Sequence, residues 1–454
     1  MLAASVIAAD HRLAAAVRLI SRFVRVHPEE RLTPDALRRG ERLLLAESAL
    51  ARAMGTSTSG LYLTGLALAL GANELQVGKL SGAVFVGGVL QFLVVPSLRW
   101  IGSRRWFCVL CLGTTRVLRF AIAATPLLGV WGVSPPDLIW TIYILLLLSA
   151  VTGTAAETVR QSWMTDLVPG AQLGRFLGWR SAIAGSAGIV AAVSYSRFIE
   201  LWRGSGHAAL TGFQLLIAFG TCLGVLGLWC LTKAPEPPLR ETRDGPLRWS
   251  RFAVPFKDPR FRAFMAFHCA WAFAAGIAGM FFHLYMLDYL QLRHRSMGYV
   301  WIAATDILSE VLSMSMAPVW GHLADRWGTR RMLLTAATIM AVYPLLWIPI
   351  TPGLWPLVFL VTATQFANSG MEIGPMTLAM QLAPPEHRST YLSVYRSLAC
   401  VMNAIAPVVG GAIALRVGSQ MPGLGTFALT GLHLVFVLSA MGRLGSLFLL
   451  RRIR

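Results

Sequence analysis

The stretch Gly321-His-Leu-Ala-Asp-Arg-Trp-Gly-Thr-Arg-Arg331 joins two long apolar runs, and a related stretch occurs once more in the chain. The earlier copy reads Val95-Pro-Ser-Leu-Arg-Trp-Ile-Gly-Ser-Arg-Arg105 and lies about half of the 454 residues before it. In both copies a glycine is followed, after one intervening residue, by a pair of arginines. A basic turn used twice between membrane-length segments predicts a chain built from two related halves.

The composition is that of an integral membrane protein. Hydrophobic residues make up 56% of the chain and charged residues only 13%, and the mean hydropathy is +0.60. Apolar runs of about 20 residues recur, long enough to cross the hydrocarbon layer as helices, whereas the alternation of a transmembrane barrel is absent. We expect an all-α polytopic fold with twelve transmembrane helices in two pseudo-symmetric six-helix bundles. The expected spans are residues 44–71, 77–98, 106–129, 137–160, 176–197, 210–232, 261–288, 297–319, 332–350, 355–379, 393–415 and 425–450.

Proline and charge divide the chain into parts. Residues 233–260 are rich in proline and charge and are expected to form a cytoplasmic linker between a bundle at 44–232 and a bundle at 261–454. Residues 1–43 are expected to form a cytoplasmic tail. The predicted loops on one side hold most of the 40 Lys and Arg residues, which places both termini on the cytoplasmic side of the cell (inner) membrane. Because these arginines are spread over many loops, the net charge of +19 predicts no nucleic-acid partner.

The start of the first span has two interpretations. Thr33-Pro34-Asp35 predicts a helix start, since proline suits the first turn and an acid suits the positive end of the helix dipole. A membrane span that starts only near Thr56 is the alternative. Glu47 and Arg52 would then lie outside the membrane.

Twelve expected spans and the pattern Gly-x-x-x-Asp-Arg-x-Gly-x-Arg-Arg between spans eight and nine resemble the major facilitator superfamily. The first-half copy departs from the pattern, with Val95 and Arg99 where the family has glycine and aspartate. The resemblance implies a secondary active transporter that works by alternating access. It also implies a cytoplasmic gate at the residues of the pattern: Gly321, Asp325, Arg326, Gly328, Arg330 and Arg331.

The aspartate of the pattern has a defined role in this family. It faces the N-terminus of a helix in the opposite half, where backbone N–H groups and the helix dipole favour an anion. The resemblance therefore implies that Asp325 contacts the fifth span near residues 175–178 and holds the cytoplasmic side shut. We expect Glu372 to support this latch by pairing with Arg326 or Arg330.

The first half offers a reciprocal pair for the same gate. Glu157 occupies the position that corresponds to Glu372 and is expected to pair with Arg99 or Arg104. A local pair of Glu157 with Arg160 is the alternative, because residues three apart are neighbours on a helix surface.

Asp306 and Glu310 lie near the middle of the eighth span and, four residues apart, share one face of that helix. Charge at mid-bilayer is costly, so such residues usually line a cavity or pair with another group. Two neighbouring carboxylates in a site of low dielectric suit the binding and release of a proton. We expect this pair to couple transport to protons, or to another cation. The alternative is a structural pair that an arginine of another helix neutralises.

Arg116 and Arg119 fall inside the third span, which the family places outside the cavity wall. They are expected to snorkel to the cytoplasm, bind a lipid phosphate, or pair with a carboxylate of a neighbouring span. A structural role is therefore favoured over contact with substrate.

A polar stripe at helical spacing in the tenth span indicates a substrate cavity, since small-molecule sites combine apolar walls with a few polar groups. Span seven also carries His283 and Tyr285. Single histidines fit buried packing equally well, which is the alternative. The candidates for substrate contact come from spans ten, seven and eleven: Gln365, Asn368, Glu372, His268, Trp271 and Asn403.

Motifs of enzymes and ATP-driven pumps are missing from the sequence. It has no Gly-x-x-x-x-Gly-Lys-Ser/Thr loop, no Gly-x-Ser-x-Gly turn and no cluster with metal-ligand spacing, so we expect no enzyme activity, cofactor or metal. We expect a monomeric secondary active transporter, surrounded by membrane lipid, that moves a small organic solute together with protons. The alternatives are a non-transporting membrane assembly factor or receptor on the same fold, and an exporter of lipids or amphiphiles.

Overall fold

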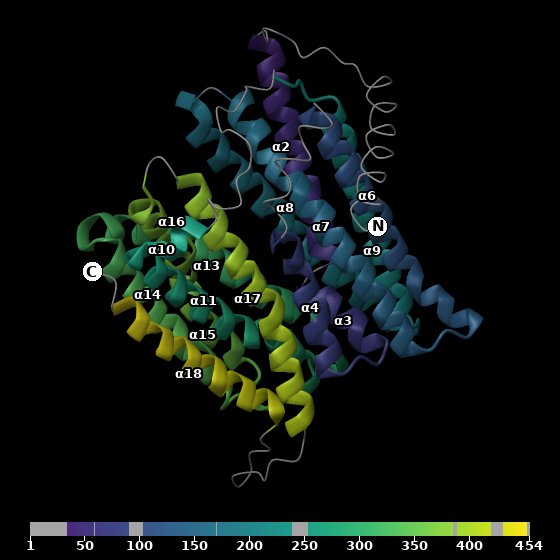
Figure 1. Ribbon diagram of the computed structural model, residues 1–454. Coiled ribbons are helices and arrows are strands. Elements are labelled where there is room, and N and C mark those ends of the chain that lie inside the picture. Colours follow the sequence, from purple (N-terminus) through teal and green to yellow (C-terminus); the bar gives the residue numbers. More distant parts are fainter. Residues whose placement is uncertain are drawn as a thin grey trace, which may run out of the picture.

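The computed structural model of the protein describes residues 34–58, 60–89, 103–168, 170–237, 253–384, 388–418 and 430–451. Nearly all of these residues are helical, and this part of the chain contains no strand. Two bundles of helices lie side by side, coloured purple to blue and green to yellow in Figure 1. The predicted all-α polytopic fold is confirmed. The predicted gate residue Arg99 lies outside the described residues.

The N-terminal bundle begins with a helix that starts at Pro34, as the sequence predicts. This helix begins ten residues before the predicted span of 44–71 and breaks at Thr58, after which a second short helix completes the first span. The helices of this bundle are α2 (Pro34–Ser57), α3 (Gly60–Ala69), α4 (Glu74–Val89), α6 (Arg104–Ala124), α7 (Pro135–Leu167), α8 (Gly170–Gly204) and α9 (Ala209–Thr232).

The C-terminal bundle has more interrupted helices than the N-terminal one. A single turn, α10 (Val254–Lys257), precedes it, and Asp258 caps the next helix by accepting hydrogen bonds from the backbone N–H groups of Arg260 and Phe261. The helices that follow are α11 (Pro259–Gly279), α12 (Phe281–Leu284), α13 (Gly298–Trp327), α14 (Thr329–Val342), α15 (Leu357–Thr362), α16 (Asn368–Leu382), α17 (Arg388–Val417) and α18 (Gly431–Arg451).

Eight helical segments in the described ranges are long and apolar enough to cross a membrane. They correspond to predicted spans three to eight, eleven and twelve. The other four predicted spans fall on helices that are interrupted, or whose described part is short, or that carry charge, as α2 does. Non-helical backbone within a membrane is tolerated where it is buried in protein or lines a cavity.

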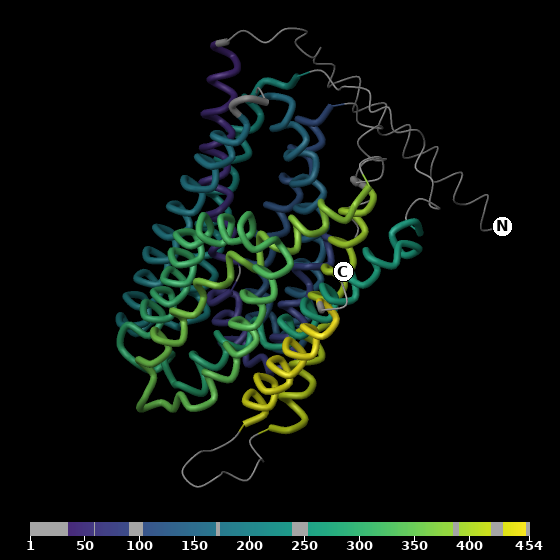
Figure 2. Tube along the Cα trace, turned by 90° about the vertical axis from the view of Figure 1, so that its left-hand side faces the viewer, coloured from purple at the N-terminus to yellow at the C-terminus, as the bar shows by residue number. Residues whose placement is uncertain are grey.

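Gly328 makes the turn between α13 and α14. Its φ of 82° and ψ of 145° form a conformation that residues with a Cβ rarely adopt, so the backbone itself requires the glycine of the motif. We call the end of the bundles at this turn the Gly328 end, and the opposite end, where α13 begins, the Tyr299 end. Figure 2 shows the beginning of the described chain, in purple, at the upper edge of the molecule, from where it runs down into the bundle.

The hydrophobic core differs between the two ends. At the Tyr299 end one cluster contains side chains of both bundles, among them Phe213, Phe281 and Tyr299. At the Gly328 end each bundle has a separate core, one around Trp163 and the other around Trp320. Among the described residues, the buried apolar cluster that both bundles share lies at the Tyr299 end.

Glycines allow α4 and α17 to approach each other, and these helices make the most extensive contact between the bundles (Figure 1). A Cβ at Gly78 would lie 2.2 Å from the carbonyl oxygen of Pro407, and a Cβ at Gly82 would lie 2.2 Å from that of Ala404. Such contacts leave no room for any side chain. Backbone therefore packs on backbone across this interface, as in other small-residue contacts of membrane helices.

A second contact joins α8 to α13. Glu200 accepts a hydrogen bond of 2.8 Å from the backbone N–H of Tyr299, and the guanidinium of Arg203 lies 5.4 Å from the centre of the Tyr299 ring. Phe213 packs edge-on against the same ring, with the centroids 5.8 Å apart. These contacts tie the start of α13 to the N-terminal bundle.

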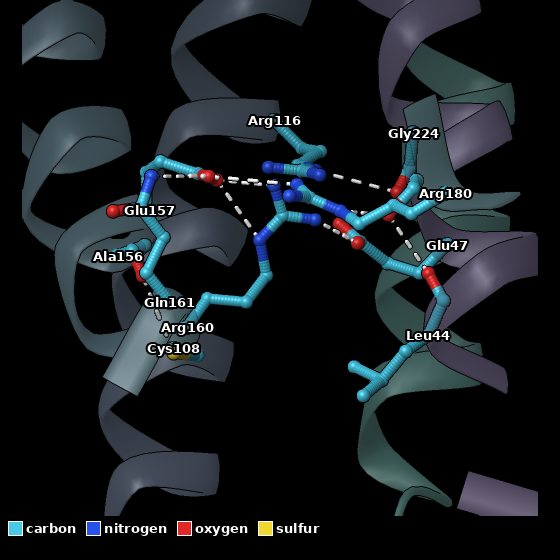
Figure 3. Close-up of polar contacts among 11 residues, drawn as sticks. Leu44, Glu47, Cys108, Arg116, Ala156, Glu157, Arg160, Gln161, Arg180 and Gly224 are labelled. Carbon is cyan, nitrogen blue, oxygen red and sulfur yellow. Dashed lines mark hydrogen bonds and ion pairs between the residues drawn. The ribbon is translucent and has the colours of Figure 1, made fainter. Parts of the chain in front are cut away.

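Buried charges hold three helices of the N-terminal bundle together (Figure 3). Arg160 of α7 forms ion pairs with Glu47 of α2 and with Glu157 of its own helix. Arg180 of α8 lies 3.5 Å from Glu157 and donates a hydrogen bond of 2.9 Å to Ser48. Glu47 is 1% exposed, so its charge depends on Arg160 for compensation. Glu47 therefore lies inside the N-terminal bundle, between α2 and α7.

The glycine contact predicts a sharp steric limit at Gly82. We expect Gly82→Ala to lower the free energy of unfolding by about 1–3 kcal/mol, because the added methyl must displace backbone. Thermal unfolding of the purified protein measures this. Gly445→Ala on α18 is the matched control, since a Cβ there meets nothing within 4 Å, and we expect it to be neutral or stabilising. Equal effects of the two substitutions would contradict the steric explanation.

The buried ion pair predicts strong coupling between Glu47 and Arg160. We expect Arg160→Met to destabilise the protein by about 3–5 kcal/mol, because it leaves a buried carboxylate without its partner. The double variant Glu47→Leu, Arg160→Met should recover most of this loss. Melting temperatures of the four proteins in this cycle provide the measurement. A double variant no more stable than Arg160→Met alone would refute the interpretation.

Candidate functional site

A cavity of about 410 Å³ lies between the two bundles, around the break that separates α2 from α3. Six helices of the N-terminal bundle line it, whereas the C-terminal bundle contributes α13 alone. Its volume falls within the range of small-molecule sites, roughly 300–1,000 Å³. Four charged residues are part of the lining, two from each bundle: Arg52, Arg119, Asp306 and Glu310.

The structure brings Asp306 and Glu310 to one wall of this cavity, as their shared helix face predicts. Each carboxylate has its own cationic or titratable partner. Asp306 Oδ2 lies 3.0 Å from Nε2 of His283, and Glu310 Oε1 lies 3.2 Å from Nη2 of Arg52 in the opposite bundle. The side chains of Asp306 and Glu310 are 47% and 42% exposed, so both remain accessible from the cavity.

The pair of Arg52 and Glu310 matches the alternative interpretation, in which an arginine of another helix neutralises a carboxylate. Because both side chains are about half exposed, this pair contributes little to stability. It is nevertheless an ion pair that crosses from one bundle to the other, so it can respond to their separation.

His283 is a site residue that the sequence named only as a polar member of its span. It lies on α12, the short helix after the end of α11, and its side chain is 16% exposed. A Cβ at Gly60 would lie 3.5 Å from Cε1 of His283. The φ of Gly60 is +50°, a conformation that glycine adopts without strain. The break in the first span thus brings α3 close to His283.

The two arginines of the third span differ in position. Arg116 is buried and donates hydrogen bonds of 3.3 Å to the carbonyl oxygens of Leu112 and Gly224, which fits the expected structural role. Arg119 lies on the cavity wall and donates to the hydroxyl of Thr58. The expectation that this span stays outside the wall is therefore wrong for Arg119. The cause is the break at Thr58, which leaves an opening through which a third-span side chain reaches the cavity.

The polar stripe of the tenth span borders a second, smaller cavity of about 170 Å³. Asn368 donates a hydrogen bond of 2.8 Å to Glu372, and both residues line this cavity together with Glu310. Gln365 lies one turn earlier, in a short 3-10 helix, and lines neither of the two cavities. Glu310 is thus the residue that the two cavities share.

Three further candidates lie inside the C-terminal bundle, away from the larger cavity. His268 stacks on Phe264 with a centroid distance of 5.9 Å, which fits the packing alternative. Trp271 is 8% exposed and has the guanidinium of Arg443 over its ring. Asn403 belongs to the interface of α11 and α17, since its Oδ1 would lie 3.4 Å from a Cβ at Gly276.

The gate motif lies at the Gly328 end, where the bundles are apart. Asp325, Arg326 and Arg331 are exposed, and Arg330 is half-buried. Residues 175–178 of α8 are mostly exposed as well, and among the described residues no hydrogen bond or ion pair joins Asp325 to them. The expected contact between Asp325 and α8 is not formed in this conformation.

The structure gives Glu157 its local partner. Glu157 pairs with Arg160 and Arg180, whereas Arg104 pairs with Asp166 at 2.6 Å. The expected pair of Glu157 with Arg104 is thus absent from this conformation. The reason is geometric, because Arg160 follows Glu157 by three residues on the same helix.

Within the described ranges, no group of three or more His, Cys, Asp or Glu residues is placed to hold a metal ion.

Comparison with solved structures shows the same fold. A mutant of the nucleoside transporter NupG has a TM-score of 0.71 at 15% identity, over 91% of this chain and 99% of that one. A D-xylose–proton symporter has a TM-score of 0.64 at 15% identity, over 91% and 96%. A bacterial homologue of the iron transporter ferroportin, in its inward-facing state, has a TM-score of 0.64 at 13% identity, over 91% and 98%.

Comparison of the sequence with family models agrees with this result. No curated protein matches the chain. The model of the Major Facilitator Superfamily matches residues 46–407 and 301–451, which together span most of the sequence. The chain therefore belongs to the major facilitator superfamily.

Proposed function

We propose that the protein is a secondary active transporter that moves a small organic solute by alternating access, coupled to protons. The observation that carries this proposal is the cavity between the bundles, with charged residues of both bundles on its walls. A non-transporting scaffold has little reason to keep such charges in a membrane, where they are costly. An exporter of lipids would favour an apolar cavity, so the four charges favour a polar solute.

The two ends of the bundles support alternating access. Apolar packing closes the Tyr299 end, and the gate motif is exposed at the Gly328 end. In this proposal the Gly328 end and both termini lie in the cytoplasm, because the loops predicted on that side carry most of the arginines. In this proposal the conformation faces inward. The opposite state requires the shared core to part and the latch of Asp325 to form.

Proton coupling is assigned to the pairs on α13. Histidine is the side chain whose charge changes most readily near neutral pH, and His283 lies in contact with Asp306. When Glu310 takes up a proton, its attraction to Arg52 in the opposite bundle is lost. Protonation at one wall would thereby loosen the contact between the bundles, which links ion binding to movement.

Neutral substitution at Asp306 tests the coupling. In proteoliposomes, a gradient of pooled small metabolites is imposed across the membrane. We expect the wild-type protein to move protons across the membrane together with its solute. Asp306→Asn should abolish this flux while leaving exchange of solute between the two sides. The measurement is pH-sensitive dye fluorescence beside tracer counterflow. Asp288→Asn is the matched control, because Asp288 is an exposed carboxylate paired with Arg293 at 2.9 Å, away from the cavity. Proton flux that survives in Asp306→Asn would exclude this residue from coupling.

Asp325 provides a test of the proposed latch. We expect Asp325→Asn to slow transport and to increase protease access at the Gly328 end, because the closed state loses its anion at the helix N-terminus. His322→Gln serves as the control, since His322 is exposed and lies one turn away. An unchanged transport rate together with unchanged protease access would rule out the latch.

A further inference from the structure

Arg119 differs from the other charged residues of the cavity wall in having no carboxylate partner among the described residues. Its guanidinium donates a hydrogen bond to the Thr58 hydroxyl, and its Nε is buried without a partner. Arg52, Asp306 and Glu310 are all engaged in pairs. A guanidinium without an anion inside a membrane protein carries a large desolvation cost.

The surroundings of Arg119 add to this positive charge. One turn away on α6 lies Arg116, whose partners are carbonyl oxygens. The buried cluster of Figure 3 combines three arginines with two glutamates, so it has a surplus of one positive charge: Arg116, Arg160, Arg180, Glu47 and Glu157. The N-terminal wall of the cavity therefore attracts an anion, whereas the α13 wall carries two carboxylates.

We propose that Arg119 binds the carboxylate of the transported solute, so that the substrate class is the organic monocarboxylates. This inference rests on the proposed transport function. A guanidinium presents a planar fork of donors that matches a carboxylate, and the Thr58 hydroxyl beside it supplies a further polar contact. The bound anion compensates the charge that the protein leaves unpaired.

The opposite wall limits the substrate to one negative charge. Asp306 and Glu310 face the same cavity of about 410 Å³, and a second anionic group would meet these carboxylates. Like charges that face each other in a site of low dielectric disfavour each other strongly. A dicarboxylate or a phosphate dianion is thus a poorer fit than a monocarboxylate. A hydroxyl or ammonium group toward Asp306 would be accepted.

Ligand binding to the purified full chain in detergent tests the inference without any gradient. The probes are acetate, lactate and benzoate, each beside the neutral amide of the same skeleton, at up to about 10 mM. Binding is measured as a rise in melting temperature, since a ligand of the folded state stabilises it. We expect at least one carboxylate to bind about tenfold or more tightly than its amide.

Variants of Arg119 assign the effect to this residue. Arg119→Gln should remove the preference for the carboxylate, and Arg119→Lys should retain part of it. Without ligand, Arg119→Gln should melt at the same temperature as wild type or higher, because an unpaired cation is lost; a purely structural arginine would give a lower value. Arg197→Gln is the control, since Arg197 is exposed on α8 and lies outside the cavity.

Three results would overturn the inference. They are equal binding of carboxylates and amides, a carboxylate preference that persists in Arg119→Gln, and no stabilisation by any carboxylate. The last result counts because acetate is small enough for any cavity of this volume. Carboxylate binding without transport in proteoliposomes would instead contradict the proposed function and leave this site standing.

Discussion

Charge inside a membrane protein must be compensated, and this requirement organises both the bundle and the cavity. Glu47 is buried against Arg160, which in turn fixes α7 against α2. In the cavity the same requirement is met across the bundle interface, where Arg52 faces Glu310. Arg119 is the charged residue of that wall for which the described part of the chain offers no counter-ion. A solute that supplies the missing charge completes the site, so binding and compensation become one event.

The bundle interface has two different kinds of contact. Between α4 and α17, glycines let backbone touch backbone at Gly78 and Gly82, and this geometry tolerates no added atom. Around Tyr299 the contact consists of an aromatic ring, a carboxylate and an arginine, which can slide and separate without a steric clash. A rigid contact beside a yielding one is the arrangement that allows one bundle to rotate against the other while the interface stays aligned.

Much of the fold was predictable because it depends on local pattern. Apolar runs predicted the spans, and the glycine of the motif predicted the turn that Gly328 makes with φ of 82°. The shared face of Asp306 and Glu310 followed from helical spacing. Their partners did not, because Arg52 and Glu310 are 258 positions apart and meet only when the bundles dock. The prediction that the third span stays outside the cavity wall is wrong for Arg119 for a related reason. The break at Thr58 exposes this residue to the cavity, and the apolar periodicity of the sequence does not predict that break.

The shared apolar core at the Tyr299 end has a thermal consequence. In a state open at the Tyr299 end, side chains such as Phe213 and Phe281 would meet water instead of each other. Exposure of apolar surface raises the heat capacity, and the driving force that keeps such surface buried weakens on cooling. The free-energy difference between the two states should therefore curve with temperature, and cold should favour the state that is open at the Tyr299 end. The packing at the closed end thus makes the populations of the two states depend on temperature.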